Sequence, residues 1–357
     1  MEIWKIDKNF APGNVQADGD VTRYAIPCAP FDLYGVYYDD AERRFVRLPA
    51  DVAAATNEGV VWLRTHTSGG RLRFATDSDY IEIAVRYNNM EVSSHIPLSA
   101  TAGFILTDET DENRPVFAAA FRPEATSEGG FAGSAMLAGG KMRQYTLYFP
   151  LYNEVTGLQI GLREGARVAG GRPYREGGPV LYYGSSITQG ACASRPDNCY
   201  PAYISQWTNT DYINLGFSGS GKAEPAIVKY LSAIPCRAFV CDYDHNAPDA
   251  AYLQKTHRPL YETFRAAQPD TPILFMTRPD FEFDPRSKGR RAVIRDTYDF
   301  ARANGDKNVY FLDGETLFGT EDRTHCTVDR CHPTDLGFYF MAKAVYAKLC
   351  EAGVFDR

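Results

Sequence analysis

Five short apolar runs alternate with helix-like stretches in the second half of this chain of 357 residues, and no other feature constrains the fold as strongly. Short, mostly apolar runs at this spacing are typical of strands buried inside a sheet. A strand, a helix and a second strand in succession require right-handed crossovers, so we expect a parallel α/β sheet with helices on both faces. The expected strands are 180–183, 212–215, 238–241, 273–276 and 309–312, and helices are expected near 200–208, 222–233, 249–267, 288–304 and 334–351.

The first 170 residues have a different texture, in which polar and apolar residues alternate and turns are frequent. Alternation with a period of two indicates strands with one buried face, and glycine pairs at 129–130 and 139–140 punctuate the pattern. We see no long amphipathic helix there, and many short strands at fairly regular spacing predict a jelly-roll-like β-sandwich. The expected strands are 71–74, 80–87, 103–106, 116–121, 144–149 and 158–162.

A segment rich in arginine and glycine separates the two textures. Residues 163–178 contain few apolar side chains, which is typical of a linker. We therefore expect a β-sandwich domain at 1–170 and an α/β domain at 178–357, each of ordinary domain size.

Charge and hydropathy exclude several classes of partner. The formal net charge is −7 and no long Lys/Arg block is present, so we do not expect binding to nucleic acid. No stretch of about 18 apolar residues exists, so no membrane span is expected. The first residues, MEIWKIDKNFAPG, lack the pattern of a secretory signal, so a cytoplasmic location is expected.

Eight cysteines are present, and two pairs lie close in sequence, Cys192 with Cys199 and Cys326 with Cys331. Neither pair has the two-residue spacing of a zinc knuckle. We therefore favour free thiols in a reducing compartment and expect no metal site, while disulfide bonds within these pairs stay open as an alternative.

Functional side chains of open parallel sheets gather at the carboxyl ends of the strands. Ser186 follows the first buried run, in a tight turn whose backbone N–H groups can face an oxyanion, although a serine there can simply cap the next helix. Asp329 and His332 lie three residues apart before the last helix, so the carboxylate can hold the imidazole as a general base. Together these residues predict a nucleophile, Ser186, a general base, His332, and a carboxylate that orients the base, Asp329.

Two further polar segments follow the second and third runs. Residues 216–221 form a glycine-rich turn, and Asn246 could donate its amide N–H groups to an oxyanion. The alternative is a nucleotide-binding P-loop, because 216–223 nearly fits G-x-x-x-x-G-K-[ST]. That alternative is disfavoured because Ala223 replaces the required hydroxyl residue and because it leaves Ser186 and His332 unexplained.

These segments, in this order, resemble the four sequence blocks of the SGNH hydrolases, also called the GDSL esterase/lipase superfamily. Ser186 matches the nucleophile of the first block, Gly219 and Asn246 match the oxyanion donors of the second and third, and Asp329 and His332 match the last. The resemblance covers about the last 180 residues and implies a flavodoxin-like five-stranded fold. It also implies a Ser-His-Asp triad that works through an acyl-enzyme without a cofactor.

Two departures from the usual blocks concern the surroundings of these residues. Position 185 is Ser where the family usually has Asp, which should weaken the hydrogen bonds of the loop but keep the nucleophile. Asn246 is followed by Ala247 where the family usually has Asp. The Asn itself is present, so the donor role that the resemblance implies is kept. The implied oxyanion donors are the N–H groups of Ser186 and Gly219 and the amide of Asn246.

A β-rich domain ahead of an SGNH domain resembles the bacterial two-domain carbohydrate esterases. This resemblance implies removal of O-acetyl groups from sugars, with a lipase or lysophospholipase of the GDSL type, or an inactive sugar-binding relative, as alternatives. The expected partner is a small-molecule or oligosaccharide ester, for which His245, Arg195 and Arg278 are candidate contacts. We expect the sandwich to form one wall of the pocket, and a fragment from about 176 onward to keep activity on simple esters.

Overall fold

The computed structural model describes residues 3–7, 19–279 and 285–356, and none of the predicted site residues lies outside them. Its second half contains a five-stranded sheet in the order β14-β13-β15-β16-β17, with every neighbouring pair parallel, which confirms the predicted α/β fold. The strands are β13 (Val180–Gly184), β14 (Tyr212–Gly216), β15 (Ala238–Asp242), β16 (Ile273–Met276) and β17 (Val309–Leu312).

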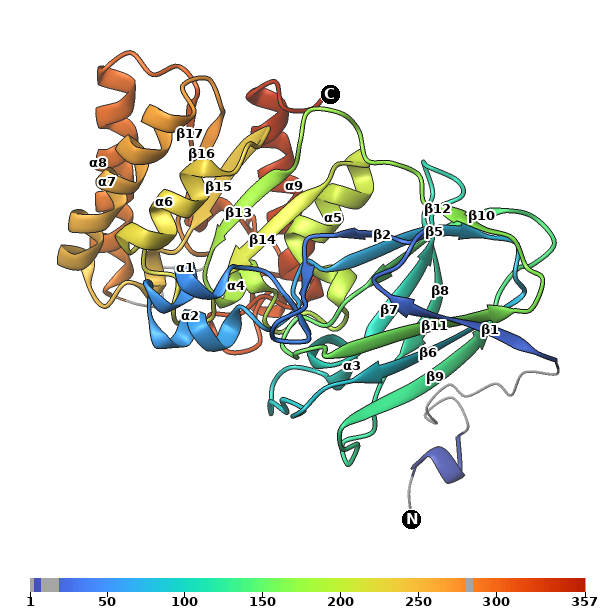
Figure 1. Ribbon diagram of the computed structural model, residues 1–357. Helices are drawn as coiled ribbons and strands as arrows, with labels where there is room; N and C mark the ends of the chain where they lie inside the picture. The colour runs from blue at the N-terminus through green and yellow to red at the C-terminus, as the bar shows by residue number, and fades with distance from the viewer. Residues whose placement is uncertain (1–2, 8–18, 280–284, 357) are drawn as a thin grey trace.

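Helices cover both faces of this sheet (Figure 1). Successive side chains of a strand point to opposite faces, so Val180 and Tyr182 join the core beneath α5 and α9, while Leu181 and Tyr183 join the core beneath α6, α7 and α8. Asp249 caps α7 by accepting the N–H of Tyr252. The helices are α4 (Ser186–Gln189), α5 (Tyr200–Thr208), α6 (Pro225–Ala233), α7 (Ala250–Ala267), α8 (Ser287–Ala303) and α9 (Asp335–Glu351).

The first half forms the predicted β-sandwich. A four-stranded sheet, β1-β11-β6-β9, faces a six-stranded sheet, β12-β5-β10-β7-β8 with β2 beside β5, and the inward residues form one apolar core. A ribbon of β3 and β4 stands apart. The strands are β1 (Val21–Ile26), β2 (Asp32–Tyr34), β3 (Tyr37–Asp39), β4 (Arg44–Val46), β5 (Arg71–Thr76), β6 (Tyr80–Arg86), β7 (Phe104–Asp108), β8 (Val116–Phe121), β9 (Gly130–Met136), β10 (Arg143–Tyr148), β11 (Gly157–Arg163) and β12 (Val168–Gly170).

The segment predicted as a linker is partly structured. Val168–Gly170 pairs with β5 as strand β12, so the sheet continues into residues that the composition alone assigned to a linker. This strand, Val-Ala-Gly, is short and lies at the edge of its sheet, where the outer side needs no apolar residues.

A segment of the first half, residues 47–68, packs on the α/β domain. It contains α1 (Ala50–Ala54) and α2 (Glu58–Leu63), which the alternation pattern did not predict, and α1 lies against α6 (Figure 1). Val60 and Leu63 belong to the same apolar core as Leu215 and Phe217. These two helices therefore complete one face of the parallel sheet. A third short helix, α3 (Leu98–Thr101), lies between β6 and β7.

Arg47 fixes this segment to the parallel sheet. Its side chain is almost fully buried, with a relative exposure of 3%, and its guanidinium lies 4.8 Å from the ring centre of Phe217. Burial lowers its pKa to about 9. Four backbone carbonyls accept its N–H groups at 2.6–2.9 Å and compensate for the lost hydration: those of Leu63, His66, Asn214 and Gly216.

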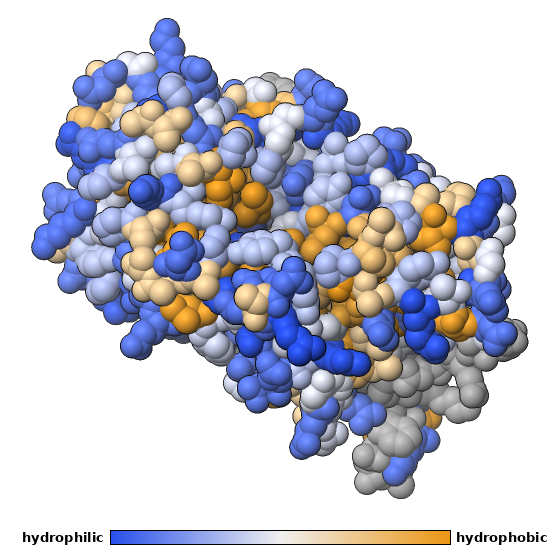
Figure 2. All heavy atoms as spheres, viewed as in Figure 1, coloured by the Kyte–Doolittle hydropathy of each residue, from blue (hydrophilic) through white to orange (hydrophobic). Residues whose placement is uncertain are grey.

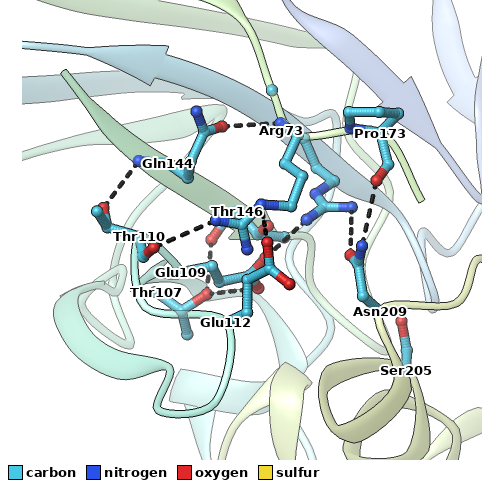
Figure 3. A network of polar contacts seen from close by, with 12 residues as sticks. Arg73, Thr107, Glu109, Thr110, Glu112, Gln144, Thr146, Pro173, Ser205 and Asn209 are labelled. Carbon is cyan, nitrogen blue, oxygen red and sulfur yellow. Dashed lines mark hydrogen bonds and ion pairs between the residues drawn. The ribbon is translucent and has the colours of Figure 1, made fainter. Parts of the chain in front are cut away.

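The two domains also meet through buried arginines of β5. Arg71 donates to the Asp211 carboxylate at 2.7 Å and lies over the ring of Tyr212. Figure 3 shows the neighbouring network, in which Arg73 donates to Glu109 and to Asn209, while Asn209 donates to the Pro173 carbonyl. Because buried charges must be paired, these contacts define how the two domains lie against each other.

The surface seen in Figure 2 is largely hydrophilic, and its apolar residues form separate patches. Among the residues that the structure describes, no helix has the length and apolar character needed to cross a membrane.

Candidate active site

Ser186 occupies a tight turn between β13 and α4. Ser185 caps the short helix by accepting the N–H of Ile187, which places the backbone of Ser186 at the helix start. The turn requires glycine at position 184, because a Cβ there would come within 2.3 Å of the Asp242 carbonyl oxygen. Ser186 is therefore held at the carboxyl end of a central strand, with a relative exposure of only 6%.

A continuous chain of hydrogen bonds joins the three residues predicted as nucleophile, base and acid. The Oγ of Ser186 lies 2.9 Å from Nε2 of His332, and Nδ1 of His332 lies 2.7 Å from Oδ2 of Asp329. The other carboxylate oxygen of Asp329 accepts the backbone N–H groups of Cys331 and His332. With Nδ1–H donated to the carboxylate, Nε2 is free to accept the hydroxyl proton of Ser186.

The surroundings shift the pKa of Asp329 and the pKa of His332. Burial alone would raise the pKa of Asp329, but the hydrogen bonds from His332 and Cys331 outweigh it and lower that pKa below its usual value. Burial lowers the pKa of His332 despite its hydrogen bond to Asp329, and nearby His245 and His95 lower it further. At neutral pH the pair therefore consists of a carboxylate and a neutral imidazole, which is the state a general base requires.

We expect kcat/KM for a simple ester to rise with pH through one ionisation below 6.5, the ordinary histidine value, and to be level above it. Below that pKa the imidazolium cannot accept the Ser186 proton, so activity is lost as pH falls. A pH profile of initial rates measures this, with samples pre-incubated at each pH and assayed at neutral pH to control for denaturation. An acid limb centred above pH 7 would contradict the expectation.

The glycine-rich turn and Asn246 lie at the same edge of the sheet as Gly184, which precedes the turn of Ser186. A Cβ added at Gly221 would be 2.3 Å from the Gly184 carbonyl oxygen and 3.6 Å from the amide nitrogen of Asn246, so three strand ends converge here. Asn246 donates one amide N–H to the Phe217 carbonyl at 3.0 Å. Gly219 has φ +65°, and a side chain there would meet open space. Asn246 and the turn that contains Gly219 thus lie at the strand end from which the Ser186 turn begins.

The three predicted substrate contacts differ in their placement. Arg278 is buried and donates to the Arg330 carbonyl at 2.9 Å, so it supports the loop that carries the base. His245 is close enough for its charge to lower the His332 pKa, and its Nδ1 lies 3.2 Å from Asp244.

Arg195 points elsewhere. It pairs with Asp197 at 2.9 Å and lies over the ring of Phe117 in the sandwich, and it does not line the cavity at His332. Its contacts are a local ion pair and a ring contact with the sandwich, so the structure offers no support for a substrate contact.

A cavity of about 350 Å³ opens onto His332, and much of its wall comes from the sandwich half of the chain. His95 lies with its ring centre 5.8 Å from that of His332, and the Tyr152 hydroxyl donates to the Ser186 carbonyl at 3.4 Å. No local pattern marks these residues, because their place depends on how the two domains dock. The lining residues are Trp62, Leu63, His66, Glu91, Val92, Ser93, His95, Ile96, Thr101, Tyr152, Ala191, Ser218 and His332.

A second, more polar cavity of about 410 Å³ adjoins the first. Trp62, His66 and Glu91 line both, and the Trp62 side chain is 53% exposed at their common edge. The remaining wall of the second cavity is formed by Glu42, Arg44, Val61, Arg64, Thr65, Asn88, Asn89 and Glu154.

The P-loop alternative is wrong. A P-loop lysine must open the helix that follows the glycine turn, but α6 begins only at Pro225, after Lys222 and Glu224. Ala223 has a positive φ and donates its N–H to the Tyr183 hydroxyl, so it is directed into the protein. All eight cysteines lie in described residues and are free thiols in the structure.

Two family models match the chain. The model of the GDSL-like Lipase/Acylhydrolase family matches residues 178–350, and a model of the N-terminus of SGNH-hydrolase-type esterases matches residues 26–168. Together these models account for most of both domains. No protein of curated function matches the sequence.

Several solved structures share the whole two-domain architecture. A Bacteroides ovatus protein described as a GDSL-like lipase is 28% identical, covers 93% of this chain and 98% of its own, and has a TM-score of 0.81. The salicylyl-acyltransferase SsfX3 from a tetracycline biosynthetic pathway is 17% identical, with a TM-score of 0.77 and coverages of 94% and 98%. An acetyl xylan esterase from the rumen bacterium Butyrivibrio proteoclasticus is 12% identical, with a TM-score of 0.62 and coverages of 94% and 100%.

Proposed function

Because this chain belongs to the SGNH (GDSL) hydrolase superfamily of esterases, we propose that it is a serine esterase that removes acetyl groups from the hydroxyl oxygens of carbohydrates. The observation that carries the proposal is the unbroken hydrogen-bonded chain from Ser186 through His332 to Asp329, which opens into a cavity.

The proposed reaction follows from this geometry. His332 takes the hydroxyl proton of Ser186, whose Oγ attacks the ester carbonyl, and Asp329 stabilises the imidazolium that forms. The N–H groups of Ser186 and Gly219 and the amide of Asn246 are the proposed donors to the oxyanion. The protonated His332 then gives its proton to the departing sugar oxygen, and water releases acetate from the acyl-enzyme in a second, equivalent step.

The carbohydrate part of the proposal rests on the two adjoining cavities. The one beside His332 has an apolar wall that suits a small acyl group, whereas the second offers carboxylate, guanidinium and amide groups that can bind hydroxyls. Trp62 stands between them with an exposed indole, the kind of surface on which a sugar ring can stack. The acetyl xylan esterase of the same fold favours this substrate class.

The proposal is tested by incubating the protein with a panel of acetylated oligosaccharides and measuring, by mass spectrometry, the loss of one acetyl unit per cleavage. A parallel series of p-nitrophenyl esters compares acetyl with octanoyl chains. We expect acetyl loss from at least one oligosaccharide and a higher kcat/KM for the acetyl ester. A preference for octanoyl esters, with no deacetylated sugar, would instead support the lipase alternative.

Trp62→Ala is expected to lower kcat/KM on an acetylated oligosaccharide by about tenfold, which corresponds to about 1.4 kcal/mol of lost binding. The loss on p-nitrophenyl acetate should be smaller, because that substrate does not reach the second cavity and remote binding energy is not used. Trp62→Phe, which keeps a stacking surface, is the matched control. Equal losses on both substrates would show that Trp62 acts on the fold or the nucleophile rather than on the sugar.

A further inference from the structure

Three potential metal ligands from separate parts of the chain meet beside the active-site cavity, and two of them, His95 and His332, line it. His95 lies in the segment between β6 and α3, Cys192 follows α4, and His332 precedes α9. One ligand atom of each residue lies within 4.8 Å of the ligand atoms of the other two. No zinc motif is visible in the sequence because the three residues are far apart in the chain and come from both domains.

The free donor atoms of this cluster can be assigned from its hydrogen bonds. Nδ1 of His332 is held by the Asp329 carboxylate, so Nε2 is the nitrogen available to a cation. Nδ1 of His95 lies 2.9 Å from the Ser93 hydroxyl, so Nε2 is the nitrogen of this ring that is available to a cation. Two imidazole nitrogens and one thiol sulfur form a donor set that Zn²⁺ prefers. A carboxylate behind a ligand histidine is the usual support of such a site.

We propose that the cavity binds one Zn²⁺ ion through His95, Cys192 and His332, and that the bound ion inhibits the esterase. The nitrogen that would hold the ion is the one that accepts the Ser186 proton, and one lone pair cannot serve both. Inhibition rests on the proposed function, whereas binding of the ion does not.

The dimensions of the cluster fit a tetrahedral ion. Zinc–nitrogen and zinc–sulfur bonds of about 2.0 and 2.3 Å place ligand atoms roughly 3.5 Å apart, so a shift of about 1 Å suffices. His95 can supply that shift because its side chain is exposed, whereas Cys192 and His332 are held by their packing. Burial, followed by Asp329 and Cys331, raises the pKa of Cys192 to about 12, so binding of zinc must displace its proton.

A second group of candidate ligands, Asp242, Asp244 and His245, is a poorer zinc site. The two oxygens of Asp244 already accept the N–H groups of His245 and Arg278, so this residue has no oxygen without a partner. The group also lacks a sulfur donor. The His95 cluster is therefore the one that we assign.

Zinc binding is measured by isothermal titration calorimetry on the metal-free full-length protein. We expect one site, and a dissociation constant raised about tenfold or more in His95→Ala and in Cys192→Ser. His325→Ala and Cys331→Ser, which change a surface histidine and a neighbouring thiol outside the cluster, should bind as the unchanged protein does. With Co²⁺ as the probe, a thiolate-to-metal absorption band should form and should be missing only in Cys192→Ser.

Inhibition is expressed for each variant as the ratio of ester hydrolysis with and without zinc, so that any loss of basal activity cancels. The ratio should lie well below one for the unchanged protein and for both controls, and close to one for His95→Ala and Cys192→Ser.

Equal binding by all variants, or none by the unchanged protein, would overturn the site. Binding without inhibition would overturn only the inhibitory role. If a variant does not fold, as judged by circular dichroism, His95→Gln or Cys192→Ala replaces it. If no ester is hydrolysed, the proposed function fails while calorimetry still decides the site.

Discussion

Ser186→Ala is expected to lower the hydrolysis of p-nitrophenyl acetate by about 10³-fold or more while the protein stays folded. The hydroxyl is the only group in the hydrogen-bonded chain that can form the acyl-enzyme, and it lies 2.9 Å from the nitrogen that takes its proton. Removing one oxygen from a side chain in this turn leaves the cap of α4 intact, because Ser185 supplies that cap. The measurement is a steady-state kcat/KM with circular dichroism as the check on folding.

The neighbouring serine provides a matched control. Ser185→Ala removes the hydroxyl that accepts the Ile187 N–H and should reduce stability by about 1 kcal/mol, as the loss of a helix cap does. Its activity should stay within about tenfold of the unchanged protein, because it makes no bond to His332. If Ser186→Ala retained activity within a few-fold of the unchanged protein, the assignment of Ser186 as nucleophile and the proposed reaction would both be wrong.

Arg47→Met is expected to destabilise the protein by about 3 kcal/mol or more, because it leaves four buried carbonyls without donors. Methionine fills much of the volume but offers no N–H group. A domain has only about 5–15 kcal/mol of stability, so the variant should unfold at a much lower temperature or denaturant concentration. Thermal unfolding followed by circular dichroism measures the difference.

Arg44→Met is the matched control for Arg47→Met. Arg44 is three residues away and pairs with Glu154, but its side chain is 27% exposed, so its loss should change stability by at most about 1 kcal/mol. Similar midpoints for Arg47→Met and the unchanged protein would show that water or other donors satisfy the four carbonyls.

The contacts of Arg47 count against the expectation that a fragment from about residue 176 stays active. Such a fragment lacks the guanidinium that binds the Asn214 and Gly216 carbonyls and the helices that cover Leu215 and Phe217. The apolar face so exposed is a core surface, and we expect the fragment to aggregate.

The sequence predicted the parallel sheet and the convergence of Ser186, Asn246 and His332 because both follow from local rules. Buried strands carry a recognisable apolar pattern, and the carboxyl ends of parallel strands meet at one edge. The same rules bring Ser186, His332 and Asp329 close enough for the two hydrogen bonds that join them. Their catalytic roles stay predictions until the variants are measured.

What the sequence could not predict depends on the docking of two domains. Trp62 and His95 reach the cavity only because the sandwich lies beside the strand ends, and nothing in their neighbours along the chain signals this. Arg195 illustrates the converse, since the sequence made it a candidate substrate contact, whereas in the structure it contacts Asp197 and Phe117 and does not line the cavity. The helices of 47–68 were missed because they are short and their apolar faces match a partner in the other domain.

The placement of residues 47–68 sets an order of events during synthesis. Domains fold as the chain emerges, N-terminal part first, so the sandwich can form before the parallel sheet exists. Val60 and Leu63 must then wait for Leu215 and Phe217, which the ribosome adds about 150 residues later. Until that point Val60 and Leu63 of α2 lack their packing partners in the parallel sheet. Asn57 of this early segment donates to the Ser220 carbonyl at 3.0 Å, so the turn that carries Gly219 gains this contact only after both halves of the chain have been made.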